Sequence, residues 1–220
     1  MESIEAWFPR GLVVDAANVV SAPVTAEGLC PLRISWEKEK INGIEAINDY
    51  VNVPSQLLLP RLVEPHAHLD KIFTWKKFPN LAGTYGGALE ANLEEHQART
   101  AQGVRFRAEK ALNLALKNGL RSVRTHVDSF GLNGEQSLQV LIDLKEKWKS
   151  LIELQFVALV PLDYWNSSEG TLLATRVSGQ GGLLGGVIAP PFDKRKSYRD
   201  LLELFKLARQ LECGVDLHID

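Results

Sequence analysis

The sequence lacks the features that mark several large classes of protein. No apolar run approaches the roughly 20 residues that a membrane-spanning helix needs. The net charge is only −2, which argues against attraction to nucleic acid or to a membrane surface. The first residues are acidic and lack a basic segment followed by an apolar one, so we expect no signal peptide.

Cysteine is also scarce. Cys30 and Cys213 lie far apart and form no CxxC pair, so we interpret them as buried thiols of a reducing compartment rather than a disulfide or a zinc knuckle. This predicts a cytoplasmic protein. The composition, with 45% hydrophobic and 24% charged residues, is that of an ordinary globular protein.

Two histidines end the most informative stretch, residues 57–71 (LLLPRLVEPHAHLDK). Its first part is apolar and predicts a strand, and in a strand residues i and i+2 point to the same face. His66 and His68 therefore reach one point at the end of the strand, as two ligands of one metal ion must. Imidazole suits zinc, iron, nickel and copper.

Strands and helices are expected to alternate after this stretch, as in a parallel sheet. The apolar patterns predict helices at 90–118, 136–148, 169–178 and 197–212, and strands at 120–127, 152–159, 181–189 and 215–219. Together they predict an α/β fold, a partial (β/α)8 TIM-type barrel of about five strands, covering residues 57–220. A complete barrel usually needs about 250 residues.

The preceding residues, 1–56, are predicted to form a small β segment. Candidate strands lie at 11–14 and 32–36, and Asn42-Gly43 is a turn signal. This segment contains no cluster of ionisable residues that would suggest a site.

Histidines concentrate where a barrel places its active site, at the carboxyl ends of the strands. His66 and His68 end the first predicted strand, His126 ends the second and His218 ends the fifth. Four of the five histidines in the chain thus fall at positions that can converge.

Three motifs, in order, resemble the amidohydrolase superfamily and, within it, the cytosine-deaminase-like group. They are VEPHAHLDK, NGLRSVRTHVDS at 118–129 and LECGVDLHID at 211–220. The resemblance implies that residues 1–56 contribute to a small β-sandwich. It also implies that His66, His68 and His218 bind one divalent ion, zinc or iron, which an aspartate of an eighth strand completes. His126 matches a histidine of the group, and both ligation and a supporting hydrogen bond remain open for it.

By the same resemblance, the reaction is metal-assisted hydrolysis of a non-peptide C–N bond in a cyclic amidine or amide. A glutamate in a motif like His-x-Asp-Glu protonates the leaving nitrogen, and here His218-Ile219-Asp220 match the first three positions. Asp220 is thus a candidate supporting residue. We expect a truncated barrel that lacks its proton-transfer residues and has little or no catalysis. Asp70 and Asp128 are expected to orient the histidine rings.

The substrate is expected to be a small heterocyclic molecule. Trp75, in the loop 72–89, and His126 are candidate substrate-binding residues, although the loop aromatics fit a packing role equally well. Lys71 does not match the bridging lysine of some family members, and we expect a solvated or supporting side chain. Leu159-Val160-Pro161-Leu162-Asp163 replaces the glutamine context of cytosine deaminases, so a related cyclic amide, aminotriazine or N-substituted heterocycle fits as well as cytosine.

Two alternatives remain. In the first, the chain is a catalytically inactive relic or a subunit that needs a partner. An incomplete barrel leaves unpaired sheet edges, which favour a homo-oligomer or a complementing chain. A less favoured alternative is an α/β protein that binds a phosphorylated ligand. The absence of a glycine-rich loop opening a helix counts against it.

Overall fold

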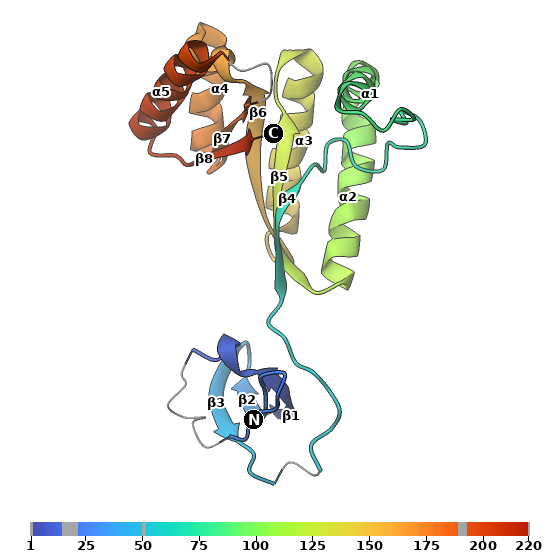
Figure 1. Ribbon diagram of the computed structural model, residues 1–220, viewed down its shortest axis with the longest axis vertical. Coiled ribbons are helices and arrows are strands. Elements are labelled where there is room, and N and C mark those ends of the chain that lie inside the picture. The colour runs from blue at the N-terminus through green and yellow to red at the C-terminus, as the bar shows by residue number, and fades with distance from the viewer. Residues whose placement is uncertain (1, 15–21, 50–51, 189–192, 220) are drawn as a thin grey trace. The chain divides into compact units, whose positions relative to one another are not determined.

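The computed structural model describes residues 2–14, 22–49, 52–188 and 193–219. The chain forms two compact units, Met1–Pro60 and Arg61–Asp220 (Figure 1). Each unit has its own hydrophobic core and is described by itself.

The first unit is a three-stranded antiparallel sheet in the order β1-β2-β3, formed by β1 (Glu2–Pro9), β2 (Leu29–Glu37) and β3 (Lys40–Ala46). The predicted strand at 32–36 lies within β2. The strand predicted at 11–14 is wrong, because the 3-10 helix η1 (Arg10–Leu12) begins that stretch. The strand that pairs with β2 on this side is β1.

The expected turn at Asn42-Gly43 is also wrong. The hairpin turns earlier in the chain, between β2 and β3, where Lys38 adopts a φ of 58°. The register then shifts between Ser35 and Trp36, and Asn42 is the extra residue on β3. The Asn-Gly pair therefore marks a β-bulge, which needs the same tolerance of unusual backbone as a turn.

The second unit is built on a five-stranded, wholly parallel sheet in the order β4-β5-β6-β7-β8 (Figure 1). Its strands are β4 (Leu62–Ala67), β5 (Leu120–Asp128), β6 (Glu153–Pro161), β7 (Leu183–Ile188) and β8 (Val215–Ile219). The sheet curls into part of a barrel, as the sequence predicted. None of the helices in the described ranges is both long and apolar enough to cross a bilayer.

Five α-helices and a 3-10 helix connect these strands. They are α1 (Tyr85–Ala98), α2 (Ala101–Lys117), α3 (Gly131–Trp148), η3 (Leu162–Asn166), α4 (Ser168–Gly179) and α5 (Lys194–Gln210). The single helix predicted at 90–118 is two helices. Arg99 is extended (φ −69°, ψ 140°), and the Thr100 side chain accepts a hydrogen bond from the backbone N–H of Gly103. Thr100 therefore starts a new helix as its N-cap.

The central strands are the most buried part of the second unit. In β6, five consecutive residues from Phe156 to Val160 are buried, as expected where both faces of a sheet are covered. The terminal strands differ: Leu62 and Val63 of β4 are about half exposed, and no residue of β8 is buried. Within the described ranges, β4 pairs only with β5 and β8 only with β7.

Gly170 lies where the first turn of α4 crosses η3, and a Cβ atom there would contact the Tyr164 carbonyl oxygen and lie 2.9 Å from the Trp165 Cα atom. We expect Gly170→Ala to lower the free energy of unfolding by about 1–3 kcal/mol, because backbone atoms cannot move aside as a flexible side chain can. Urea denaturation measures this.

Gly179, at the other end of α4, has no atom within 4 Å of the corresponding Cβ position, so Gly179→Ala is the matched control. Equal stability of the two variants would contradict the packing argument.

Candidate metal centre

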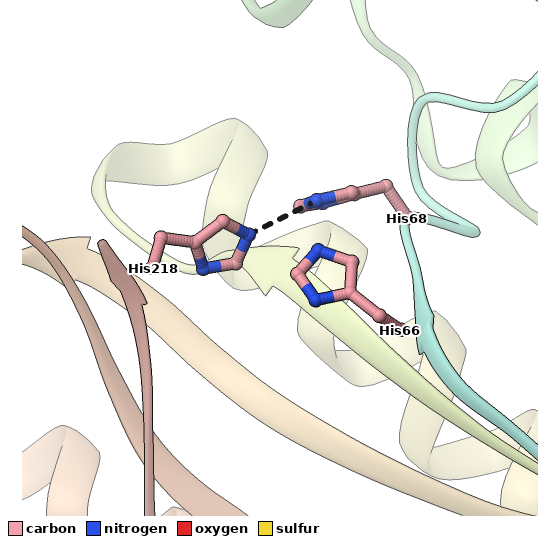
Figure 2. A group of neighbouring side chains, drawn as sticks. All are labelled: His66, His68 and His218. Carbon is pink, nitrogen blue, oxygen red and sulfur yellow. Dashed lines mark hydrogen bonds between the residues drawn. The ribbon is translucent and has the colours of Figure 1, made fainter. Parts of the chain in front are cut away.

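Three histidines converge at the carboxyl ends of the strands (Figure 2). His66 lies in β4, His68 follows it immediately and His218 lies in β8. One ring nitrogen from each residue lies within 4.8 Å of the others. The His68 Nε2 and His218 Nε2 atoms are 3.2 Å apart. Two nitrogen ligands about 2.1 Å from a tetrahedral zinc ion lie roughly 3.4 Å apart, so this separation fits two ligands of one ion.

The curl of the sheet makes this approach of the histidines possible. β4 and β8 are the first and last of five strands, and in a flat sheet they would lie roughly 19 Å apart at the usual interstrand spacing. Side chains alone cannot bridge that distance to bring His68 and His218 together. The geometry therefore depends on the fold as a whole.

The protonation of His68 also suits a metal ligand. Burial, with help from the nearby charge of Lys71, lowers the pKa of His68 to about 3. The ring is neutral at pH 7, as a metal-ligating imidazole must be. Its Nδ1 atom is buried and has no hydrogen-bond partner among the described residues. Three imidazoles are a donor set that fits zinc or iron.

His126 lies beneath the three histidines. Its side chain is fully buried, and its ring stacks on that of His66 with centroids 4.3 Å apart and an interplanar angle of 27°. The His126 Nε2 atom is 3.3 Å from Asp216 Oδ1, and Arg124 Nη1 donates to the other oxygen of Asp216 at 2.6 Å. His126 therefore supports His66 from below, and burial lowers the pKa of His126 itself.

A second group of charges surrounds Arg99, which is 4% exposed. Arg99 donates to Asp70 at 2.8 Å, to Glu95 at 2.8 Å and to Asp128 at 3.0 Å. The Lys71 ammonium donates to both oxygens of Asp128 at 2.9 Å. Asp70 and Asp128 thus bind cations, whereas the sequence led us to expect that they orient the histidine rings.

The carboxylates of this group differ in acidity. Burial and the neighbouring Asp128 charge raise the pKa of Asp70 to about 6, against the opposing effects of Lys71 and Arg99. Burial would also raise the pKa of Asp128, but the adjacent Lys71 and Arg99 hold it below its usual value. Asp128 is therefore the firmly ionised partner of both cations at neutral pH.

A cavity of about 760 Å³ opens beside the histidines, a size typical of small-molecule sites. Its polar lining includes His68, His218, Lys71 and Asp128. Its apolar wall consists mainly of residues at the carboxyl ends of β6 and β7, with aromatic and leucine side chains of α1 and the β5–α3 connection. These are Tyr85, Leu89, Leu93, Phe130, Leu159, Val160, Pro161, Leu162, Val187 and Ile188.

Other predicted residues are placed less centrally. Trp75 is 62% exposed and lines a neighbouring depression of about 440 Å³ that also touches His68 and Lys71. His126 lines neither hollow and contacts His66 instead. Asp220 lies outside the described residues. The substrate contacts of Trp75 and His126 stay predictions.

Sequence reasoning did not single out Arg99, Glu95 or Asp216. Asp216 precedes His218 by two residues and so shares its face of the strand, which is a usable signal. Arg99 was assigned to the interior of one long helix. Thr100, as a possible N-cap residue, was a usable signal for the helix break. No local sequence pattern predicts that Arg99 binds three carboxylates.

Comparison with curated proteins gives two informative relatives. The pterin deaminase of Rhizobium rhizogenes is 36% identical over 168 residues, covering 74% of this chain and 37% of that protein. The N-isopropylammelide isopropyl amidohydrolase of Pseudomonas sp. (strain ADP) is 27% identical, covering 87% of this chain and 48% of that protein. The chain is homologous to the cytosine-deaminase-like group of the amidohydrolase superfamily. It spans less than half the length of these curated relatives.

Solved structures confirm the fold expected of this amidohydrolase-superfamily chain. The 5-methylcytosine deaminase of Klebsiella pneumoniae, in complex with 5-fluorocytosine, matches with a TM-score of 0.76 and 24% identity, over 99% of this chain and 51% of that one. The N-isopropylammelide isopropylaminohydrolase of Burkholderia multivorans matches with a TM-score of 0.60 over 98% and 53%. No family model matches the chain.

Removal of the Arg99 side chain should strongly destabilise the chain. We expect Arg99→Met to cost about 3–5 kcal/mol of unfolding free energy, because buried carboxylates lose their shared cation. Arg105→Met is the control, since Arg105 pairs with Asp143 at the surface, where both side chains are at least 40% exposed, and should cost at most about 1 kcal/mol. Urea denaturation distinguishes the two, and similar costs would contradict the argument.

His126 should tune metal affinity through His66. We expect His126→Ala to weaken zinc binding about 10–100-fold, as is typical when a partner of a ligand is lost. His126→Phe keeps a flat ring against His66 but loses the Asp216 contact, so its affinity should lie between that of His126→Ala and wild type. Competition with a chromogenic chelator measures both values. Unchanged affinity in His126→Ala would contradict a supporting role.

Proposed function

We propose that the chain carries the metal-binding part of a metal-dependent hydrolase that cleaves a non-peptide C–N bond of a cyclic amidine or amide. The observation that supports this most is the set of three imidazole nitrogens within 4.8 Å of one another, beside a cavity of about 760 Å³. The relatives named as a pterin deaminase and an amidohydrolase support the same kind of reaction.

His66, His68 and His218 would hold one divalent ion, zinc or iron. The chemistry that such an ion supplies is a lower pKa of water, near 7, which provides a nucleophile at neutral pH. His68 and His218 also line the cavity, so an ion that they held would be accessible from it. His126 fixes the His66 ring by stacking, and the apolar wall of the cavity keeps bulk water from the bound ring.

The substrate we propose is a planar nitrogen heterocycle with an amino substituent. The relatives' names refer to pterin and to N-isopropylammelide, which are compounds of this class. The carboxyl end of β6, from Leu159 to Asp163, forms part of the cavity wall. This supports a role in selecting among such rings for the residues that replace the glutamine of cytosine deaminases.

A second candidate is a catalytically inactive or partner-dependent subunit that keeps the fold. The observation that favours it is the pair of edge strands, β4 and β8, each of which has one neighbour within the described ranges. Unpaired edges favour strand addition by a second chain, so a homo-oligomer or a complementing chain is the corresponding proposal. For either candidate we propose a reducing, cytoplasmic location, in agreement with the free thiols of Cys30 and Cys213.

The metal centre is tested by elemental analysis of the purified chain. We expect near one equivalent of zinc or iron, lost in His68→Ala and in His218→Ala because each removes a ligand. The control is His96→Ala, since His96 stacks on Phe130 outside the cluster and should leave the metal content unchanged. Retention of metal in both ligand variants would refute the proposed centre.

Activity separates the two candidates. The metal-replete chain is assayed for ammonia or amine release from pterin, N-isopropylammelide and 5-methylcytosine. Release that His68→Ala abolishes supports a hydrolase, whereas no release from a metal-replete chain supports the inactive or partner-dependent subunit.

A further inference from the structure

Lys71 is a polar residue of the cavity to which the proposed metal centre gives no role. It lies three positions after His68 and lines the cavity together with His68 and His218. Its side chain is only 19% exposed, so it is neither a solvated surface lysine nor a fully enclosed one. Its charge is also close enough to lower the pKa of His68.

The ammonium group of Lys71 is held in one orientation. Asp128 accepts from it with both carboxylate oxygens at 2.9 Å, and Asp128 is fixed in turn by Arg99 Nη2 at 3.0 Å. An ammonium has three N–H donors, so at least one remains after these two bonds. A cation fixed by a buried ion pair is preorganised to donate to a ligand.

The buried carboxylates do not need Lys71 as their cation. Arg99 binds Asp70, Glu95 and Asp128, and Arg107 donates to Glu95 at 2.9 Å. Each carboxylate therefore has an arginine partner already. Lys71 adds a positive charge on the cavity side of this group, where its remaining N–H donor is available to a ligand.

We propose that Lys71 is a substrate-binding residue that donates to an exocyclic oxygen of the heterocycle, that of a lactam carbonyl or its anion. This inference rests on the proposed function, because it assumes a ring bound beside the histidines. Lys196, which also lines the cavity, is less suited to the role: its side chain is 48% exposed, and its ammonium donates to Asp163 and Asp200.

The test compares two probes that have no exocyclic C–N bond to hydrolyse. 2-Hydroxypyrimidine carries the exocyclic oxygen, and pyrimidine lacks it. Dissociation constants are measured by NMR titration of the zinc-loaded chain. We expect the wild type to bind 2-hydroxypyrimidine about tenfold more tightly than pyrimidine, because hydrogen bonds to charged donors are the strong ones.

Lys71→Met should reduce this preference to within about twofold and leave pyrimidine binding nearly unchanged. Lys71→Gln, which keeps a donor but no charge, is a second variant with an intermediate preference expected, and Lys196→Met is the control that should retain the full preference. Thermal melts and zinc content are recorded for every variant. A preference that survives in both Lys71 variants, or a wild type that binds both probes equally or neither, overturns the proposal.

The two proposals fail in different ways. Loss of the metal centre would appear as a zinc content that does not depend on His68 or His218. Failure of the Lys71 assignment would appear as an oxygen preference that does not depend on Lys71 while zinc remains bound.

Discussion

The guanidinium of Arg99 joins three parts of the fold through buried ion pairs. Its carboxylate partners come from the segment after β4, from α1 and from β5. Because a charge buried to this degree must be paired, these elements cannot separate without exposing an unpaired ion. The segment that contains Asp70 and Lys71 is thereby fixed two residues after His68. The orientation of His68, a proposed metal ligand, thus depends on ion pairs that do not themselves touch the histidines.

Two layers of support lie beneath the site and differ in chemistry. In one layer, Arg124 and His126 of β5 and Asp216 of β8 form a chain of contacts that ends in the stacked ring of His66. In the other layer, Arg99 holds Asp128, which in turn accepts from Lys71. The first layer positions His66, a proposed ligand of the metal, and the second positions Lys71, the residue that we assign to the substrate. Separate supports of this kind allow metal affinity and substrate preference to change independently.

Local patterns predicted the parallel α/β order and the convergence of His66, His68 and His218, because strand period and strand ends are properties of short segments. The local patterns gave wrong predictions where one sequence signal is compatible with two structures. Asn42-Gly43 marks a bulge rather than a turn, and a helical composition across Arg99 and Thr100 hid a break. The partners of Asp70 and Asp128 could not be predicted at all, since they depend on Arg99, which lies 29 residues from each of them along the chain.

The ligands of the proposed centre come from the two outermost strands of a curled sheet, β4 and β8. An ion bound by residues of both strands would link the two edges of the sheet and hold the sheet in its curled form. Binding that requires one curvature also stabilises that curvature, by a free energy that grows with the logarithm of the free ion concentration. The curvature of the sheet would therefore depend on the concentration of free metal ion. Without the ion, the positions of β4 and β8 relative to each other would be less tightly constrained.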